Sequence, residues 1–315
     1  MRRFKTIAVL AATLGLAAFS ASAHAEGEQV IQVPGFADFL AVDGKTVWTT
    51  NKGRVEQWSR KGKLAEIAVA RPCGAMVIAN DSLWVANCAD GTLNRIDIRT
   101  GKLAATIPTG IPKLTGGAEM MVAAGAGSIW MATDVKGVIA RVDPATNTVV
   151  ASVTVDPGTS YVVSGYGAIW AVALGQQSIQ RIDPATNTVT KRTLLGKAPG
   201  FLAAGEGAIW VQEQGDGTVA RIDPVSGEVT GRVKVGDNLK WGDIDTGAGK
   251  VWLRTTDDQL FATIDVKTMT VVSRLGKPAG SGALRWTKSG VWTTAHDEHT
   301  LTWWPTKSLK PKPGE

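Results

Sequence analysis

The sequence repeats one short phrase, an aliphatic residue followed by tryptophan, at seven nearly regular places. The tryptophans of this phrase are Trp48, Trp84, Trp130, Trp170, Trp210, Trp252 and Trp292. They follow one another at intervals of 36 to 46 residues, and about 40 to 45 residues is the length of a four-stranded propeller blade. The repeat therefore predicts an all-β fold, a single seven-bladed β-propeller of four-stranded blades. We expect the seven tryptophans to fill the core between blades.

The unit at 159–197 shows how one repeat divides into strands. TSYVVSG is expected as the inner strand, AIWAVA as the second, SIQRID as the third and TVTKRTLL as the outermost. Glycine and asparagine separate these segments, and both accept the positive φ of tight turns.

A second repeated phrase lies between the third and outermost strands. It reads RIDIRTGK at 95–102, RVDPATNT at 141–148, RIDPATNT at 181–188 and RIDPVSGE at 221–228. Asp-Pro favours a turn, and Asn187 can take a left-handed conformation. We interpret the phrase as a blade-building turn, with Arg181 and its equivalents bonding to neighbouring strands or blades.

The two ends of the chain predict how the ring closes. After Trp304 the last unit has no fourth strand, whereas residues 30–33 (VIQV) precede the first unit as an outermost strand would. We expect this N-terminal strand to complete the last blade, because an open ring would leave strand edges unpaired.

Residues 1–25 have the pattern of a cleaved signal peptide, with a basic start, an apolar run and Ala23-His24-Ala25 before the cut. We expect cleavage after Ala25, export to the periplasm or secretion, and no membrane span afterwards. The propeller is predicted over 26–308, followed by a disordered Pro/Lys tail at 309–315.

The charge of the chain is carried largely by its ends. The formal charge of +6 falls to +3 without the signal peptide, because three of the 34 basic residues and none of the 28 acidic ones lie there. No basic footprint for a nucleic acid remains. We expect a monomer whose partner is a small molecule, a peptide or a cell-envelope protein.

Cys73 and Cys88 are the only cysteines. A hairpin that turns at Asn80 and Asp81 would place them opposite each other on neighbouring strands. We predict a disulfide, since an exported protein meets an oxidising environment. A redox pair is the alternative, although CxxC spacing is absent.

Aromatic side chains cluster near the starts of the inner strands, which surround one mouth of the central channel. Phe39 and Trp286 are expected to pack between blades. The residues predicted to bind a ligand at the mouth are Phe36, Tyr161, Phe201, Lys240, Trp241, Asp243 and Arg285.

The repeat GAIWVQEQGDGTVARIDPVSGEV (207–229) and its siblings resemble the YVTN-type bacterial propellers and the streptogramin (virginiamycin B) lyase family. The resemblance covers essentially the whole chain after residue 25. It implies an elimination that opens a cyclic depsipeptide with the help of Mg²⁺, using a Glu soon after a blade tryptophan and histidines. Glu213 follows its tryptophan by three residues, but Gly215 stands where the family has a histidine. On this reading, Glu213, His296 and His299 are the candidate catalytic residues.

The segment AHDEH (295–299) holds both histidines of the chain after residue 25. His296, His299 and Glu298 could bind a divalent metal, Mg²⁺ or another. The alternative is a solvated hairpin tip.

Three functions stay open at this point. The first is a propeller that binds a small molecule, peptide or envelope partner at its channel mouth. The second is a lyase of the streptogramin-lyase type, and the third is an interaction scaffold without a small ligand.

Overall fold

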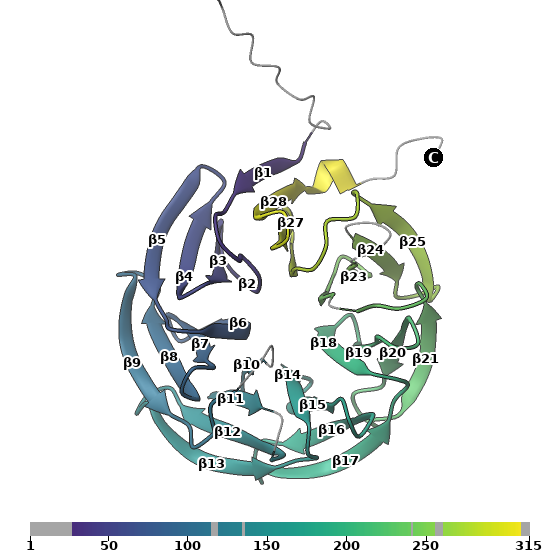
Figure 1. Ribbon diagram of the computed structural model, residues 1–315. Coiled ribbons are helices and arrows are strands. Elements are labelled where there is room, and N and C mark those ends of the chain that lie inside the picture. Colours follow the sequence, from purple (N-terminus) through teal and green to yellow (C-terminus); the bar gives the residue numbers. More distant parts are fainter. Residues whose placement is uncertain (1–26, 115–118, 134–135, 241, 256–260, 310–315) are drawn as a thin grey trace, which may run out of the picture.

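The computed structural model describes residues 27–114, 119–133, 136–240, 242–255 and 261–309. In these residues, 28 strands form seven four-stranded antiparallel sheets arranged in a ring (Figure 1). The predicted seven-bladed β-propeller is therefore confirmed. The predicted signal peptide (1–25) lies outside the described residues, and of the predicted tail only Leu309 lies within them.

Each blade has an inner, a second, a third and an outer strand. The inner strands are β2 (Leu40–Asp43), β6 (Pro72–Ala79), β10 (Met121–Gly125), β14 (Thr159–Gly165), β18 (Pro199–Gly205), β22 (Ile244–Gly247) and β26 (Leu284–Thr287). The second strands are β3 (Thr46–Asn51), β7 (Ser82–Asn87), β11 (Ser128–Thr133), β15 (Ala168–Ala173), β19 (Ala208–Glu213), β23 (Lys250–Arg254) and β27 (Gly290–Ala295).

The third strands are β4 (Arg54–Ser59), β8 (Thr92–Asp97), β12 (Val138–Asp143), β16 (Ser178–Asp183), β20 (Thr218–Ile222), β24 (Phe261–Asp265) and β28 (Thr300–Pro305). The outer strands are β5 (Gly62–Ala68), β9 (Lys102–Pro108), β13 (Thr148–Thr154), β17 (Thr188–Leu194), β21 (Val229–Lys234), β25 (Thr270–Leu275) and β1 (Gln29–Gln32). A short 3₁₀ helix, Thr306–Leu309, follows β28.

The ring closes through its two ends, as predicted. The seventh sheet has the order β1-β28-β27-β26, so the first strand of the chain is the outer strand of the last blade (Figure 1). Gln29 pairs with Trp303 and Gln32 with Thr300, antiparallel. The joint removes two strand edges that would otherwise be unpaired.

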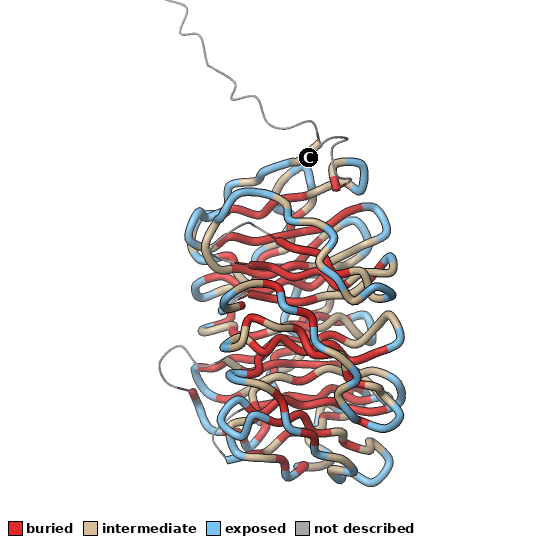
Figure 2. The backbone as a smooth tube through the Cα atoms, turned by 90° about the vertical axis from the view of Figure 1, so that its right-hand side faces the viewer, coloured by how far each residue is buried: buried red, intermediate tan, exposed pale blue. Residues whose placement is uncertain are grey.

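The core lies between neighbouring sheets, and the repeat tryptophans occupy it. All seven are at most 4 % exposed. Five of them donate their indole N–H to the carbonyl five residues earlier, as Trp130 does to Gly125 at 2.9 Å. Each such tryptophan therefore fills the space between blades and closes the inner hairpin of its own blade. In side view, buried residues follow the strands and exposed residues gather in the turns (Figure 2).

The repeated Arg-x-Asp phrase forms a turn, as interpreted. Asp183 Oδ1 accepts the amide N–H of Ala185 at 2.8 Å, and Asn187 has a φ of 59°. Arg141 lies over the ring of Trp130 at 4.9 Å and donates to the Pro184 carbonyl of the next blade at 2.6 Å. The arginines of this phrase thus bond to neighbouring strands or blades, as predicted.

The predicted disulfide between Cys73 and Cys88 is present, with the Cα atoms 6.0 Å apart. The expected register is wrong, however: Cys73 pairs with Ala86, because the strand pairing shifts between Cys73 and Val77. Cys73 lies near the start of β6, and Cys88 follows the end of the neighbouring strand β7. The disulfide therefore joins the start of β6 to the segment after β7. In the described part of the chain, no helix is long and apolar enough to cross a membrane.

Candidate functional site

A cavity of about 940 Å³ opens on the face of the ring where the inner strands begin. Each of the seven blades contributes to its lining. The contributions are segments that lead into inner strands, such as 70–74 and 280–282, and turns between second and third strands, such as 50–53. This is the channel mouth at which the sequence predicts ligand binding.

Aromatic rings from blades that are not neighbours meet at this cavity. Phe39 leads into blade 1 and Phe201 belongs to blade 5, yet their ring centroids are 6.0 Å apart. Tyr161 of blade 4 lies 4.8 Å from Phe201. Phe39 was expected to pack between blades. Instead it reaches across the channel, and it lines the cavity although it is only 4 % exposed.

Phe36 is at the rim of the cavity and is 37 % exposed. Its ring stacks on the imidazole of His296 with centroids 4.0 Å apart, and the Lys52 ammonium lies 5.8 Å from the Phe36 centroid. Because His296 belongs to the last blade and Phe36 leads into the first, this stack lies at the junction where the ring closes.

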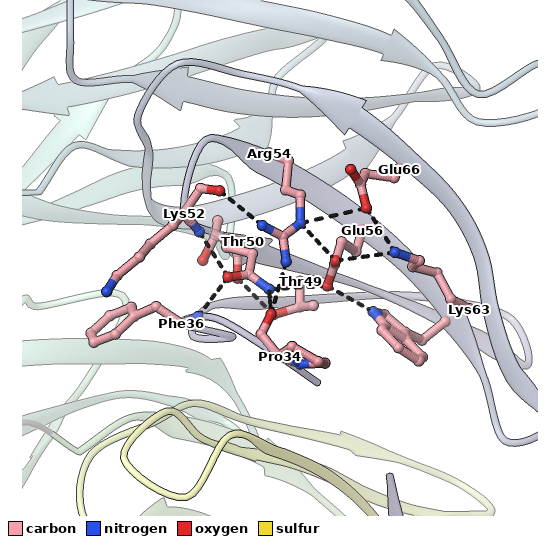
Figure 3. A network of polar contacts seen from close by, with 11 residues as sticks. Pro34, Phe36, Thr49, Thr50, Lys52, Arg54, Glu56, Lys63 and Glu66 are labelled. Atoms are coloured by element: carbon pink, nitrogen blue, oxygen red, sulfur yellow. Dashed lines mark hydrogen bonds and ion pairs between the residues drawn. The ribbon is translucent and has the colours of Figure 1, made fainter. Parts of the chain in front are cut away.

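A buried polar network fixes the backbone beside Phe36 (Figure 3). Asn51 Oδ1 accepts the Phe36 N–H at 2.5 Å, and Asn51 Nδ2 donates to the Pro34 carbonyl at 3.1 Å. Arg54 donates to the same carbonyl at 2.8 Å. The Glu56 carboxylate, 1 % exposed, accepts from both Asn51 and Arg54. The rim segment is thus held in place before any ligand arrives.

Glu213 of blade 5 stands three residues after its repeat tryptophan, as Asn51 does in blade 1. Its carboxylate accepts the Gly196 N–H at 2.7 Å, the Thr218 hydroxyl at 2.6 Å and the Arg232 Nε at 2.9 Å. The side chain is fully buried and does not line the cavity. Asn87 similarly accepts the Arg71 N–H in blade 2. The polar residue three positions after these tryptophans therefore anchors the segment that leads into its blade.

The structure separates the predicted histidine, glutamate and metal residues. His296 lines the cavity, where its Nδ1 is 3.0 Å from Asp297 Oδ1, and burial lowers the pKa of His296. His299 and Glu298 are exposed and do not line the cavity. Within the described residues, no three His, Cys, Asp or Glu side chains are grouped as a metal site requires. The residues that the structure describes therefore do not fit the Mg²⁺ that the resemblance implies.

Asp243 lines the cavity as predicted, but its charge is already compensated. Its carboxylate pairs with Arg285 and accepts the N–H groups of Ile244 and Leu284. Arg285 and Lys240 are not among the lining residues, and Trp241 lies outside the described residues.

Trp286 packs between blades 6 and 7, as expected, because a Cβ on Gly247 would meet its indole. The ring fills space that only a glycine leaves open. Trp286 is not among the lining residues of the cavity.

Two carboxyl groups that were not predicted line the cavity. Asp38 leads into blade 1, and Glu119 stands before the inner strand of blade 3. Burial and the neighbouring Asp243 raise the pKa of Asp38 to about 7. Burial and Asp38 raise the pKa of Glu119 to about 8. Both carboxyls therefore change charge close to neutral pH.

The position of these carboxyls was available in the sequence. Asp38 stands between Phe36 and Phe39, and Glu119 stands two residues before an inner strand. Both stand near the starts of inner strands, as the predicted aromatic residues do, so their position alone places them at the mouth. What the sequence lacks is their burial beside other acids, and the resulting pKa values.

Two solved structures share this architecture. Selenomethionine-substituted virginiamycin B lyase from Staphylococcus aureus superposes with a TM-score of 0.74 and 17 % identity, over 88 % of this chain and 98 % of that one. The computationally designed protein Ika8 gives 0.65 and 15 %, over 85 % of this chain and 83 % of that one. No protein-family model and no curated protein sequence matches the chain. At these identities the likeness establishes the propeller fold.

Proposed function

We propose that the protein binds a small molecule carrying an apolar or aromatic group in the cavity at its channel mouth. The observation that carries this proposal is the meeting of Phe39, Tyr161 and Phe201 at a cavity lined by all seven blades. Ligand sites typically enclose about 300–1,000 Å³ and combine apolar walls with a few polar groups. The cavity has both properties, and the network around Asn51 keeps its rim in place.

Binding is proposed to take place outside the cytoplasm. The Cys73–Cys88 disulfide supports this location, since such bonds persist in oxidising compartments. The expected signal peptide agrees with it. A peptide or envelope protein that inserts one aromatic side chain into the cavity would use the same surface.

A fluorescence titration of the full chain with Nile red, an uncharged dye, tests the binding function. The wild type is expected to bind it, and Tyr161→Ala is expected to weaken binding by about tenfold, because a stacking wall is lost. Tyr166→Ala is the matched control, since Tyr166 is exposed in the turn between β14 and β15, at the other end of the strand. Equal binding by both variants would contradict the proposal.

A lyase is the second candidate function, and one observation favours it. An elimination needs a base that can accept a proton at neutral pH, and Asp38 and Glu119 line the cavity with pKa values of about 7 and 8. The structural likeness to a virginiamycin B lyase supplies a substrate to test. Glu213 would then anchor a segment rather than act on the substrate.

Chromatography coupled to mass spectrometry after incubation with virginiamycin B tests this candidate. Ring opening by elimination gives a product of unchanged mass and altered retention, whereas hydrolysis adds one water. Loss of that product in Asp38→Asn or Glu119→Gln would support an acid–base role. An unchanged substrate would exclude this reaction.

A further inference from the structure

The lining of the cavity carries an uneven distribution of charge. Among the described residues, neither the Asp38 nor the Glu119 carboxyl accepts a hydrogen bond or joins an ion pair. Asp243, by contrast, is paired with Arg285. These two lining carboxyls are partly buried and have no ion-pair partner among the described residues, and leaving desolvated charges in that state is unfavourable.

Two cationic side chains, Arg71 and Lys52, also line the cavity, and Arg254 acts on it from nearby. Arg71 donates to the Leu114 carbonyl at 2.7 Å. Arg254 is fully buried and donates to the carbonyls of Thr294 and Ala279. Lys52 lies at the rim over Phe36. None of these forms an ion pair with Asp38 or Glu119 in the described structure, although Arg254 and Arg71 lower the two carboxyl pKa values through space.

The same cavity presents aromatic rings beside these carboxyls. Burial raises the pKa of the Tyr161 phenol, and the nearby Glu119 carboxyl raises it further. Tyr161 also contacts Phe201, and Phe201 contacts Phe39. Phe39 directly follows Asp38 in the segment Ala37-Asp38-Phe39. Aromatic faces and carboxylates together are the surroundings that favour an organic cation.

We infer that the cavity takes an organic cation, an ammonium or similar group on an apolar or aromatic body, with Asp38 and Glu119 as its counter-charges and the Phe39–Tyr161–Phe201 rings around its body. This inference rests on the binding function proposed above and names its ligand class. A lysine side chain of a peptide and a free amine carry the same chemistry.

Ligand binding would then be coupled to proton release. A cation stabilises the ionised carboxyls, so its affinity rises with pH as Asp38 and Glu119 lose their protons. The groups that act on Asp38 are Asp243, Asp297 and Arg254, and those that act on Glu119 are Asp38, Asp243 and Arg71. Each carboxyl can contribute up to about tenfold in affinity per pH unit below its pKa.

Calorimetric titration of the full chain with three ring systems of one size tests the inference. The probes are 1-methylquinolinium, 1-methylnaphthalene and 1-naphthoate, which are cationic, neutral and anionic throughout pH 6–9. At pH 8.5 the cation is expected to bind about tenfold more tightly than the neutral probe, and the anion most weakly. Only the cation should gain affinity between pH 6 and pH 8.5.

Asp38→Asn and Glu119→Gln are each expected to weaken cation binding by about fivefold to tenfold and to leave the neutral probe unchanged. Asp81→Asn and Glu206→Gln are matched controls, because both residues stand in turns between first and second strands, at the opposite end of the inner strands. Thermal unfolding of each variant confirms that it is folded.

The outcomes separate this inference from the function on which it rests. Equal affinity for cation and neutral probe, with both lost in Tyr161→Ala, would overturn the charge preference and leave the binding function standing. Tightest binding of 1-naphthoate would do the same. Failure of all three probes to bind at 1 mM would overturn both. A parallel titration with acetyl-Phe-Lys-amide and acetyl-Phe-norleucine-amide distinguishes a peptide lysine from a free cation as the source.

Discussion

In addition to burial, the Asp38 carboxyl raises the pKa of Glu119, although the two residues are 81 positions apart and lead into different blades. They line the same cavity because the ring brings the entrances of all inner strands to one mouth. Neither carboxyl accepts a hydrogen bond among the described residues, in contrast to the carboxylates of Glu56 and Glu213, which accept several. The propeller thus has fully buried, hydrogen-bonded acids and partly buried acids at its cavity, and the two kinds should respond differently to substitution.

Replacing the cavity carboxyls should stabilise the fold at alkaline pH. The folded-state pKa values of about 7 and 8 lie above the ordinary values of 3.8 and 4.5, so the folded chain holds more protons between about pH 4 and 8. The contribution of these groups to the free energy of unfolding therefore falls as pH rises through that range. Asp38→Asn should raise this free energy at pH 8.5 by about 1–3 kcal/mol and leave it nearly unchanged at pH 4.

Urea unfolding of wild type, Asp38→Asn and Glu119→Gln at both pH values checks this. Asp81→Asn should shift neither curve, because Asp81 is exposed. A gain of the same size at pH 4 and pH 8.5 would show that the carboxyls are not protonated in the folded state.

Glu213→Ala should weaken the fold without changing ligand binding. The substitution leaves Arg232, the Thr218 hydroxyl and the Gly196 N–H without their shared acceptor, which costs about 2–3 kcal/mol. The affinity for the cavity probes should stay within twofold of wild type, because Glu213 does not line the cavity. A stable variant that no longer binds the cavity probes would contradict this and show that Glu213 contributes to the binding site.

The arginines of the repeated turn should differ from blade to blade in how much they stabilise the fold. Arg141 Nη1 bonds to the Pro184 carbonyl and to Asn187 Oδ1 of the next blade, whereas Arg181 Nη1 bonds to Thr190 within its own blade. We expect Arg141→Ala to lower the free energy of unfolding by about 1–2 kcal/mol more than Arg181→Ala. Paired denaturant titrations measure the difference, and equal losses would mean that the contacts between blades add nothing.

Removing the disulfide should affect both stability and the cavity. The bond spans 15 residues, and a loop of that size is worth about 3 kcal/mol in the chain-entropy model. Cys73 and its neighbours 70–74 line the cavity, so the double variant Cys73→Ser/Cys88→Ser should also bind the probes less tightly. Thermal unfolding with and without reductant measures the first effect. A wild type insensitive to reductant, with the thiols shown to be free, would contradict the prediction.

The sequence was sufficient for most of the fold. The tryptophan spacing from Trp48 to Trp292 recurs in every unit, and the turn phrase that contains Asp183 and Asn187 recurs in several of them. The strand predicted at 30–33 and observed at 29–32 was expected to complete the last blade, because that unit lacks an outermost strand of its own. The repeated signals could be recognised in the sequence because a propeller blade contacts mainly its neighbours, so the pattern of one blade is contained in about 40 residues. The register of Cys73 was predicted wrongly because a regular hairpin was assumed, whereas the pairing shifts near the start of β6, as it also does in β14 and β18.

Only part of the candidate site could be predicted from the sequence. Phe36, Tyr161, Phe201 and Asp243 line the cavity at the predicted mouth, and His296 lines it beside them. Their position in each unit placed them there, because the starts of all inner strands face one end of the ring. Whether a side chain reaches the cavity or a neighbouring blade was not determined by that position, as Arg285 illustrates by pairing with Asp243.

The sequence by itself determined the number of blades and the turns, since these depend on residues close together in the chain. It also determined the closure of the ring, because the last unit lacks an outermost strand and the chain begins with a spare one. Only the tertiary structure decided which polar groups act on the cavity. The Glu213 carboxylate is bonded to Gly196 and Arg232, while the Asp38 and Glu119 carboxyls have no hydrogen bond or ion pair among the described residues, and Asp38 acts on the pKa of Glu119. Charge state depends on burial and on neighbours from other blades, and those neighbours are set by the ring as a whole.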